Sequence, residues 1–198
     1  MAFIGAAVYA DAREHRCRTT TRMNAKIILG GIAAAAAAGV ALKKRGDEKA
    51  AAAWATKRKY LVQESWVFVA KNLEENGVAF FKRIFEIAPS ALQMFSFRDE
   101  KNLYSSPMLK AHATTVMKTV GVAVAGLADL GALVPVLKSL GKKHVNYGVE
   151  PAHYEIVGTA LLDTLKVGLG KKWTPEVAQA WTEIYGVVKT TMIAGASE

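Results

Sequence analysis

The chain has 198 residues, enough for one domain of ordinary size plus an extension. Its 52% hydrophobic content is typical of a globular protein, and its single cysteine, Cys17, excludes an intramolecular disulfide and a thiolate metal cluster. Of the formal charge of +9, residues 1–60 contribute 12 basic and 4 acidic side chains, and residues 61–198 contribute 14 and 13. The basic excess therefore lies in the N-terminal part, which argues against nucleic acid as a partner of the folded domain.

The first 24 residues resemble a targeting segment. They carry four arginines and a run of three threonines, although Asp11 and Glu14 interrupt the acid-poor composition expected of a transit peptide. An uncharged, alanine-rich run follows at residues 27–42, between Lys26 and a basic triplet that ends at Arg45. Its 16 residues would span about 24 Å as a helix, less than the ~30 Å of a bilayer's hydrocarbon core.

Three interpretations of residues 27–42 remain open: the apolar part of a targeting signal, a short membrane anchor, or a low-complexity tether. We therefore expect targeting to a plastid or mitochondrion, or membrane contact through residues 26–45, with a cytoplasmic location as the alternative. Residues 47–53 have the composition of a polar, alanine-rich linker. The predicted division is an N-terminal extension at 1–58 and a folded domain at 59–198.

From Lys59 onward, hydrophobic residues recur with the period of amphipathic helices. A further segment, residues 78–87, is so rich in large apolar residues that it predicts a well-covered helix or strand. The five helical stripes are Val62, Trp66, Val69 and Leu73; Val116, Val120, Ala123 and Leu127; Leu133, Leu137, Leu140 and His144; Tyr154, Val157, Leu161 and Leu165; and Val177, Trp181, Ile184 and Val188.

The prolines support this division. Pro89, Pro107, Pro151 and Pro175 each stand where a new helical segment is about to begin, and proline favours the first turn of a helix. Pro135 lies near the start of the stripe that begins at Leu133, where a first-turn proline is tolerated. No Asn-Gly or Asp-Gly pair separates alternating apolar runs, so hairpins are not indicated. The predicted fold class is all-α.

Two of the four histidines, His112 and His144, fall on apolar helix faces and are predicted to point inward. A buried imidazole needs a partner, which is most simply a backbone carbonyl and alternatively a metal. A non-haem metal site normally recruits carboxylates or further histidines, and the nearby charged residues are lysines. A porphyrin needs only one or two axial ligands and an apolar slot, so two histidines would suffice, with Lys142 or Lys143 near the propionates.

Several segments together resemble a known family. The sequence from Phe80 to Phe97 closely resembles the region from the second helix to the following loop in plant non-symbiotic haemoglobins, or phytoglobins, and neuroglobin-like globins are also similar. The resemblance covers residues 60–195 in order. It implies a globin fold of about seven to eight helices around a b-type haem. Further matching segments are Leu109–Ala113, Leu140–His144, Tyr147–Val149, Ala152–Glu155 and Ala160–Thr164.

The resemblance also implies site residues. His144 matches the proximal ligand and His112 the distal histidine, which is both the second metal ligand and the candidate catalytic group. Met108 stands where many plant members have lysine, and the loop before the His144 helix is shorter, so the contacts at the haem edge depart from the family pattern. His153 lies in a segment that plant members use for homodimer contacts, or is an ordinary first-turn residue. The other predicted haem contacts are Phe81, Phe95, Ser96, Val116, Lys143 and Val149.

Two functions follow from the resemblance, and a third remains open. The first is binding of dioxygen and nitric oxide at an iron that His112 ligates reversibly, for oxygen binding, sensing, transport or nitric oxide scavenging. The second is an enzyme, either a nitric oxide dioxygenase or a nitrite reductase. It would depend on an external reductase, because the chain contains no dinucleotide-binding motif. The third is a haem-free, globin-like structural module.

Overall fold

The computed structural model describes residues 41–198. The chain divides into two compact units, Met1–Ala53 and Trp54–Glu198. The targeting segment and most of the alanine-rich run fall outside the described residues. In the first unit, residues 41–53 are helical and exposed. Among the described residues, no helix has both the length and the apolar character needed to cross a bilayer.

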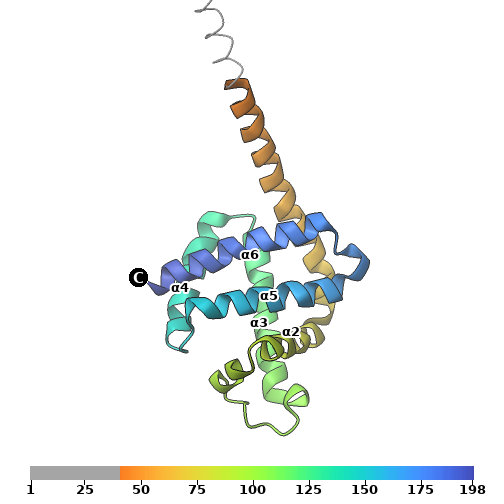
Figure 1. Ribbon diagram of the computed structural model, residues 1–198, viewed down its shortest axis with the longest axis vertical. Helices are drawn as coiled ribbons and strands as arrows, with labels where there is room; N and C mark the ends of the chain where they lie inside the picture. The colour runs from red at the N-terminus through yellow and green to blue at the C-terminus, as the bar shows by residue number, and fades with distance from the viewer. Residues whose placement is uncertain (1–40) are drawn as a thin grey trace, which may run out of the picture. The chain divides into compact units, whose positions relative to one another are not determined.

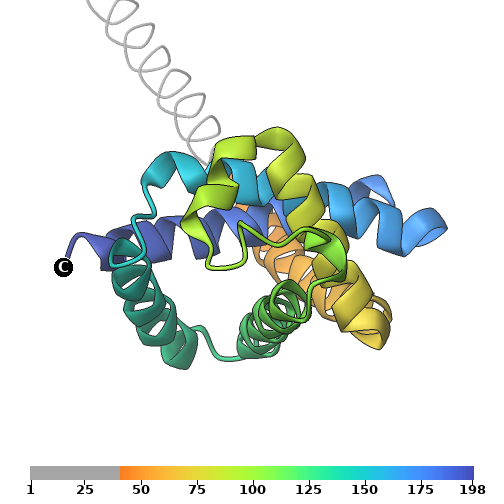
Figure 2. The same cartoon turned by 90° about the horizontal axis from the view of Figure 1, so that it is seen from below.

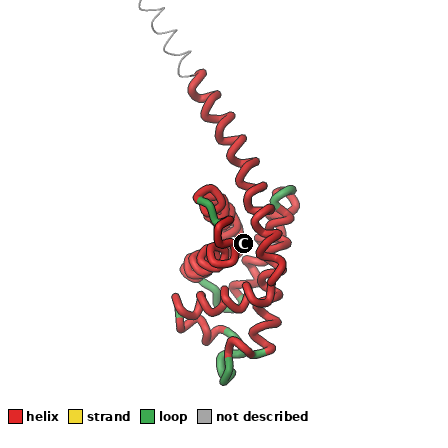
Figure 3. The backbone as a smooth tube through the Cα atoms, turned by 90° about the vertical axis from the view of Figure 1, so that its right-hand side faces the viewer, coloured by secondary structure: helices red, strands yellow, loops and turns green. Residues whose placement is uncertain are grey.

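The second unit is built from α-helices and short 3-10 helices, and residues 54–198 contain no strand, which confirms the predicted all-α class. Figure 1 shows α5 and α6 crossing the front of the unit with α3 behind them, and Figure 3 shows that only short loops join the helices. Residues 54–69 are helical. The elements that follow are η1 (Ala70–Asn72), α2 (Leu73–Ile87), η2 (Pro89–Met94), η3 (Leu103–Ser105), α3 (Pro107–Gly126), α4 (Leu130–Val145), α5 (Pro151–Leu169), η4 (Gly170–Lys172) and α6 (Pro175–Ala196).

The helix starts follow from local sequence. Pro107, Pro151 and Pro175 are the first residues of α3, α5 and α6, as predicted, because the fixed φ of proline suits the first turn. Pro89 starts the 3-10 helix η2 instead. Pro135 lies inside α4, because that helix begins at Leu130, three residues before the first residue of the predicted stripe. Side chains also cap three of these helices: Ser106 on α3, Asp129 on α4 and Thr174 on α6.

The predicted stripes supply much of the core. Val62, Trp66 and Val69 are buried, and Trp66 packs against Trp181 of α6 with ring centroids 6.0 Å apart. The indole N–H of Trp181 donates to the buried Ser65 hydroxyl at 2.9 Å, which gives both polar groups a partner. Residues 78–87 belong to helix α2 rather than to a strand.

Glycines set how closely the helices cross. A Cβ at Gly77 of α2 would lie 2.9 Å from the backbone of Ala113 in α3, and a Cβ at Gly141 of α4 would overlap the Met192 carbonyl of α6. A Cβ at Gly195 of α6 would likewise overlap the backbone of Lys138 in α4. Figure 2 shows α4 resting against α6, while α3 and α4 diverge from the short connection between them. These crossings fix α3 and α4, which carry His112 and His144.

The second unit begins at Trp54, five residues before the predicted boundary at Lys59. The indole N–H of Trp54 donates to both carboxylate oxygens of Glu183 in α6, at 2.9 and 3.1 Å. Arg58 pairs with the same carboxylate at 2.8 Å, and Lys57 pairs with Glu176 at 2.7 Å. Residues 54–58 are therefore attached to α6 by specific side-chain contacts.

Candidate functional site

His112 lies in the second turn of α3, where the close approach of Gly77 to the neighbouring Ala113 holds α3 against α2. Its imidazole contacts three phenylalanine rings, with centroid distances of 5.2 Å to Phe81, 5.5 Å to Phe95 and 5.8 Å to Phe97. We call these three phenylalanines the aromatic cluster. They place one side of the imidazole in an apolar environment, while His112 as a whole remains exposed.

The aromatic cluster joins two parts of the chain. Phe81 comes from α2 and is buried, with 3% of its surface exposed. Phe95 and Phe97 come from the segment just after η2 and stack on each other, with centroids 5.0 Å apart and planes 13° apart. The ring of Phe81 meets that of Phe95 edge-on at 5.5 Å, an arrangement that aromatic pairs prefer. The segment after η2 is thus anchored beside His112.

This environment affects the charge of His112. Partial burial lowers the pKa of His112 below its ordinary value of 6.5 because the apolar surroundings disfavour the imidazolium. The imidazole is therefore neutral at pH 7, the form that can offer a nitrogen lone pair to a metal. Val116, one helical turn further along α3, is half-buried against the core.

His144 lies in the last turn of α4 and is half-buried. Its Nδ1 is 2.8 Å from the carbonyl oxygen of Leu140, one turn earlier. Because a carbonyl oxygen can only accept, Nδ1 carries the hydrogen, and in the neutral imidazole Nε2 then has the lone pair. The backbone N–H of Val149 donates to the His144 carbonyl at 3.1 Å and ties the following loop to the same turn.

Two tyrosines flank His144. Tyr147 lies with its ring centroid 6.0 Å from the imidazole, and Tyr154 of α5 lies at 6.4 Å. Tyr154 is 7% exposed, and its hydroxyl has no hydrogen-bond partner among the described residues. Desolvation raises the pKa of Tyr154, so the hydroxyl keeps its proton. A buried hydroxyl without a partner costs about 1–3 kcal/mol, which suggests that a polar group not supplied by the described chain belongs beside it.

The remaining predicted contacts occupy different positions. Val149 is half-buried against the core, whereas Ser96 and Lys143 are exposed. The structure thus brings His112 together with Phe81 and Phe95, and places Val149 beside the His144 turn. The haem-contact roles of all these residues stay predictions.

His153 has a local role in this structure. Its Nδ1 accepts a hydrogen bond from the Glu150 backbone N–H at 2.9 Å, and the Glu150 side chain accepts in return from the His153 backbone. This reciprocal pair is a capping box at the start of α5. It accounts for His153 as a first-turn residue, the second of the two predicted interpretations.

Sequence reasoning did not single out Phe97, Tyr147 or Tyr154 as site residues. Phe97 lies two residues after Phe95 in a segment that the sequence predicts as a loop. Nothing in the sequence pattern shows that the two rings stack. Tyr154 was recognised only as part of a core stripe. The one available signal was the tyrosine hydroxyl on that stripe, since a buried hydroxyl requires a partner.

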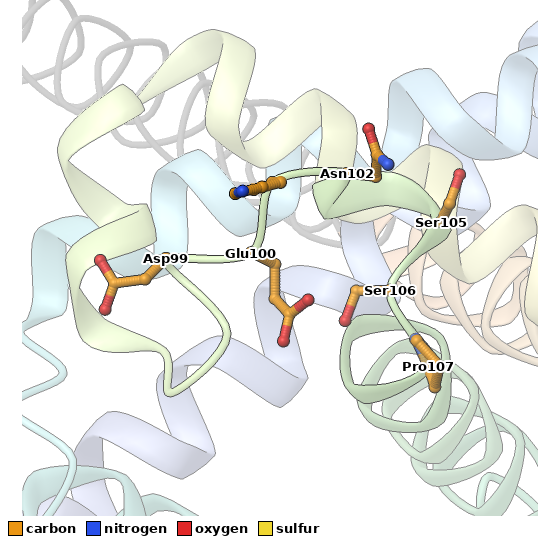
Figure 4. Close-up of a pocket in the computed structure, with 7 residues that line it drawn as sticks. Asp99, Glu100, Asn102, Ser105, Ser106 and Pro107 are labelled. Atoms are coloured by element: carbon orange, nitrogen blue, oxygen red, sulfur yellow. The ribbon is translucent and has the colours of Figure 1, made fainter.

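A pocket of about 470 Å³ lies in the loop before α3, lined by polar side chains and Pro107 (Figure 4). None of the predicted site residues lines it. Among residues 41–198, no group of three or more histidine, cysteine, aspartate or glutamate side chains is arranged to hold a metal ion. The pocket lining consists of Asp99, Glu100, Lys101, Asn102, Ser105, Ser106 and Pro107.

Comparison with known proteins gives consistent results. Residues 78–192 match the family model described as Globin. The chain is 37% identical to a neuroglobin of Tetraodon nigroviridis over 145 residues, covering 71% of this chain and 91% of that protein. It is 43% identical to an anaerobic nitrite reductase of Oryza sativa subsp. indica over 129 residues, covering 63% and 83%. An anaerobic nitrite reductase of Arabidopsis thaliana is 39% identical, covering 69% and 92%.

Solved structures agree on the fold. A Drosophila melanogaster globin superposes with a TM-score of 0.65 at 20% identity, covering 70% of this chain and 92% of that one. A hexacoordinated heme protein from an anhydrobiotic tardigrade superposes with a TM-score of 0.67 at 18% identity, covering 72% and 94%. At these identities the likeness concerns the fold, and it confirms the predicted architecture.

Proposed function

Because the chain belongs to the globin family, we propose that it binds a b-type haem with His144 as the proximal ligand and His112 on the distal side. Its function in this proposal is to bind dioxygen and nitric oxide. A haem supplies an iron that binds diatomic gases and changes oxidation state, and the protein supplies axial ligands and an apolar slot.

The contact between Nδ1 of His144 and the Leu140 carbonyl is the observation that carries this proposal. The hydrogen bond from Nδ1 to the Leu140 carbonyl fixes the ring orientation and leaves Nε2 free to donate its lone pair. Histidines that bind metals are characteristically held in this way, with the second ring nitrogen donating to a carbonyl or carboxylate.

Other residues fit the same group. The aromatic cluster offers flat apolar surface beside His112, and a haem needs such surface on both of its faces. The ring of Tyr154 lies 6.4 Å from that of His144, and the unpartnered hydroxyl of this tyrosine could donate to an acceptor on a bound group. Exposed Lys143 is placed at the end of α4, where it could meet a carboxylate from such a group.

His112 has two roles in this proposal. A neutral imidazole can act as an internal ligand, or it can withdraw and donate a hydrogen bond to a bound gas. When it acts as the internal ligand, the apparent affinity for an external gas falls below the intrinsic affinity and is proportional to the fraction of protein in which His112 has withdrawn. Such competition suits sensing or scavenging better than bulk transport.

A second candidate function is nitrite reduction or nitric oxide dioxygenation with an external reductase. Two similar plant proteins carry the name anaerobic nitrite reductase, which specifically favours the first of these reactions. Repeated turnover would require a supply of electrons from another protein. In this role, neutral His112 is the residue placed to exchange a proton with a substrate.

The absorbance spectrum of the purified protein tests the proposal. We expect haem uptake and, in the ferrous form without added ligand, the split visible bands of an iron with two histidine ligands. His144→Ala should lower haem affinity, and His112→Leu should keep haem but give a single broad visible band. His153→Ala is the matched control, because that histidine is engaged in the α5 cap and should leave the spectrum unchanged.

The outcomes are distinct. A colourless protein that takes up no haemin would refute the haem site and favour the structural module. An unchanged spectrum in His144→Ala would refute the proximal assignment alone. The enzymatic candidate requires that the ferrous protein consume nitrite or nitric oxide and be re-reduced for several turnovers, so a single turnover without re-reduction would leave only gas binding.

We also propose that the N-terminal extension directs the domain to an organelle or a membrane surface. The support is compositional: basic residues flank the alanine-rich run, and residues 1–60 hold most of the chain's net positive charge. A fluorescent fusion of the full chain should localise to an organelle or membrane, and removal of residues 1–45 should make it diffuse. Diffuse fluorescence of the full chain would count against this proposal.

A further inference from the structure

Tyr147 connects the protein surface to His144. The tyrosine is 67% exposed, yet its ring meets the His144 imidazole edge-on at a centroid distance of 6.0 Å. Its backbone N–H also donates to the His144 carbonyl at 3.0 Å, so the tyrosine is held in the same turn by the backbone. Other large apolar side chains are also exposed on this protein, and Tyr147 is set apart from them because its ring contacts the imidazole of the candidate ligand.

The charge around Tyr147 is positive. Lys142 and Lys143 are exposed and form no ion pair within residues 41–198, whereas Lys138 on the same helix pairs with Glu198. Lys143 lies in the last turn of α4, and Tyr147 lies in the turn that directly follows this helix. The only acidic residue between positions 138 and 153 is Glu150, and its side chain is engaged in capping α5.

Helix electrostatics account for only part of this arrangement. Lysines in a last helical turn interact favourably with the negative end of the helix dipole, which explains the presence of Lys142 and Lys143. It does not explain why an exposed tyrosine and an exposed valine, Val145 at 48%, stand among them. An apolar centre with a charged rim is the composition of a small protein interface.

We infer that Tyr147, Val145, Lys142 and Lys143, which we call the Tyr147 surface, are the docking and electron-entry site for an acidic one-electron carrier protein. This inference rests on the proposed function, because it requires a haem ligated by His144. In the transfer step, one electron would leave the reduced metal centre of the carrier, which is thereby oxidised, and would reduce a haem held by His144 from the ferric to the ferrous form. No atom or bond is exchanged between the two proteins.

The charge and size of the surface decide the class of partner. Two lysines without partners attract a negatively charged carrier and accelerate its encounter, an effect that weakens as salt screens it. The exposed apolar area is small, which suits a transient interface of the kind formed by redox partners rather than a permanent complex. The ring of Tyr147 then shortens the gap that the electron must cross to His144, and electron tunnelling slows steeply with distance.

Binding provides the first test and does not depend on turnover. The full-length, haem-loaded protein is titrated with an oxidised, acidic [2Fe–2S] ferredoxin in a calorimeter at increasing salt. Lys142→Gln/Lys143→Gln should weaken binding by about fivefold per lysine at low ionic strength and flatten the salt dependence. Because Lys143 is also a proposed haem contact, the haem content and spectrum of this variant are measured first.

A matched control lies elsewhere on the domain. Lys166 of α5 and Lys171 of η4 are also exposed and have no ion-pair partner in the described part of the chain. Lys166 is twelve residues from Tyr154 along α5, about 18 Å at the rise of an α-helix. Lys166→Gln/Lys171→Gln makes the same change in net charge and should bind the ferredoxin as the unmodified protein does.

Electron transfer provides the second test. At saturating reduced ferredoxin, Tyr147→Leu should slow haem reduction in stopped flow, and Tyr147→Phe should restore it, because the ring and not the hydroxyl bridges to His144. Reduction by a small neutral flavin semiquinone should be the same in all three proteins. Equal rates with ferredoxin for the unmodified protein and Tyr147→Leu would overturn the electron-entry role.

The remaining outcomes separate this inference from the proposed function. If the unmodified protein takes up no haem, the proposed function fails first. If it takes up haem but the Lys142→Gln/Lys143→Gln variant binds ferredoxin normally, the docking surface is wrong and the haem site stands. If that variant loses binding only to vesicles of phosphatidylcholine and phosphatidylserine in equal parts, the lysines face a membrane, which also overturns the inference.

Discussion

At the scale of single residues, His112 illustrates how the neighbours of a side chain determine its charge. Three phenylalanine rings surround one side of the imidazole, and no carboxylate is among its contacts in the described structure. Desolvation therefore acts without an opposing charge and lowers the pKa of His112. His112 therefore stays neutral, and able to act as a ligand, at a pH where an ordinary histidine is already protonated.

This shift predicts a dependence of stability on pH. The folded-state pKa of His112 lies below the unfolded value near 6.5, so between these two values the unfolded chain binds more protons. The contribution of His112 to stability is therefore fully present above about pH 6.5 and is lost as the pH falls through the folded-state value. Urea unfolding between pH 8 and pH 5 should show a steeper acid loss for the unmodified protein than for His112→Gln.

The control for this prediction is His153→Gln. His153 is half-buried and accepts a backbone hydrogen bond in the α5 cap, so its replacement leaves the environment of His112 intact. The acid loss in His153→Gln should match that of the unmodified protein. If His112→Gln loses stability on acidification as steeply as the unmodified protein does, desolvation of His112 is not the cause.

Residue types and spacing predicted that both histidines face inward, whereas in the structure His144 is half-buried and His112 is exposed with one side of its ring against the aromatic cluster. The Nδ1 contact to Leu140 follows from helix geometry, since the carbonyl of residue i−4 lies near a side chain at position i. The stacking of Phe95 on Phe97 could not be predicted from spacing, because it depends on the path of an irregular segment after η2. Local periodicity contains no information about that path.

At the scale of elements, the crossing of α4 over α6 determines where His144 lies. Gly141, one turn before His144, meets the Met192 carbonyl of α6, and Gly195 of α6 meets Lys138 of α4 in the same way. Two glycines facing the opposite helix allow the backbones to approach more closely than side chains would permit. The position of the candidate proximal ligand thus depends on two residues that have no side chain.

Gly141→Ala should therefore destabilise the protein and weaken haem binding together. The new methyl group would overlap a backbone carbonyl that cannot move without shifting α6. Overpacking of this kind costs about 1–3 kcal/mol, and it would displace the turn that carries His144. Denaturant unfolding and haemin titration of the same preparation measure the two effects.

Gly186 of α6 provides the matched control. A Cβ at Gly186 meets no atom within 4 Å, so Gly186→Ala adds a methyl group in open space within a helix. Alanine is more favourable than glycine inside a helix by about 0.5–1 kcal/mol, so this variant should be slightly more stable. If Gly141→Ala proved as stable as Gly186→Ala, the close crossing would not restrict α4.

The helices themselves were predictable because their apolar periodicity and starting prolines are local signals. Pro107, Pro151 and Pro175 mark the starts of three helices. Pro135 was placed too near a helix start, because Asp129 caps α4 earlier than the apolar stripe indicates. The crossings were not predictable, since a glycine in a single sequence gives no sign of which helix it will meet.

At the scale of the whole molecule, the question is where the folded domain begins. Composition placed the boundary after residue 58, because the preceding residues are rich in alanine and lysine. In the structure, the Glu183 carboxylate accepts hydrogen bonds from Arg58, Trp54 and Gln179, and these bonds lower the pKa of Glu183, with Arg58 as the largest cause. Specific contacts of this kind cannot be inferred from composition.

Truncated chains distinguish the two boundaries. A chain of residues 54–198 should melt cooperatively, and a chain of residues 59–198 should melt at a temperature several degrees lower, since each kcal/mol shifts a domain of this size by about 2–8 °C. The longer chain should also lose stability as the pH falls below 4.5 through the lowered pKa of Glu183, because that carboxylate stabilises the fold only while ionised. The shorter chain lacks Trp54 and Arg58, so this acid-dependent loss should be weaker. Equal melting temperatures and equal acid profiles would place the start of the folded domain after residue 58.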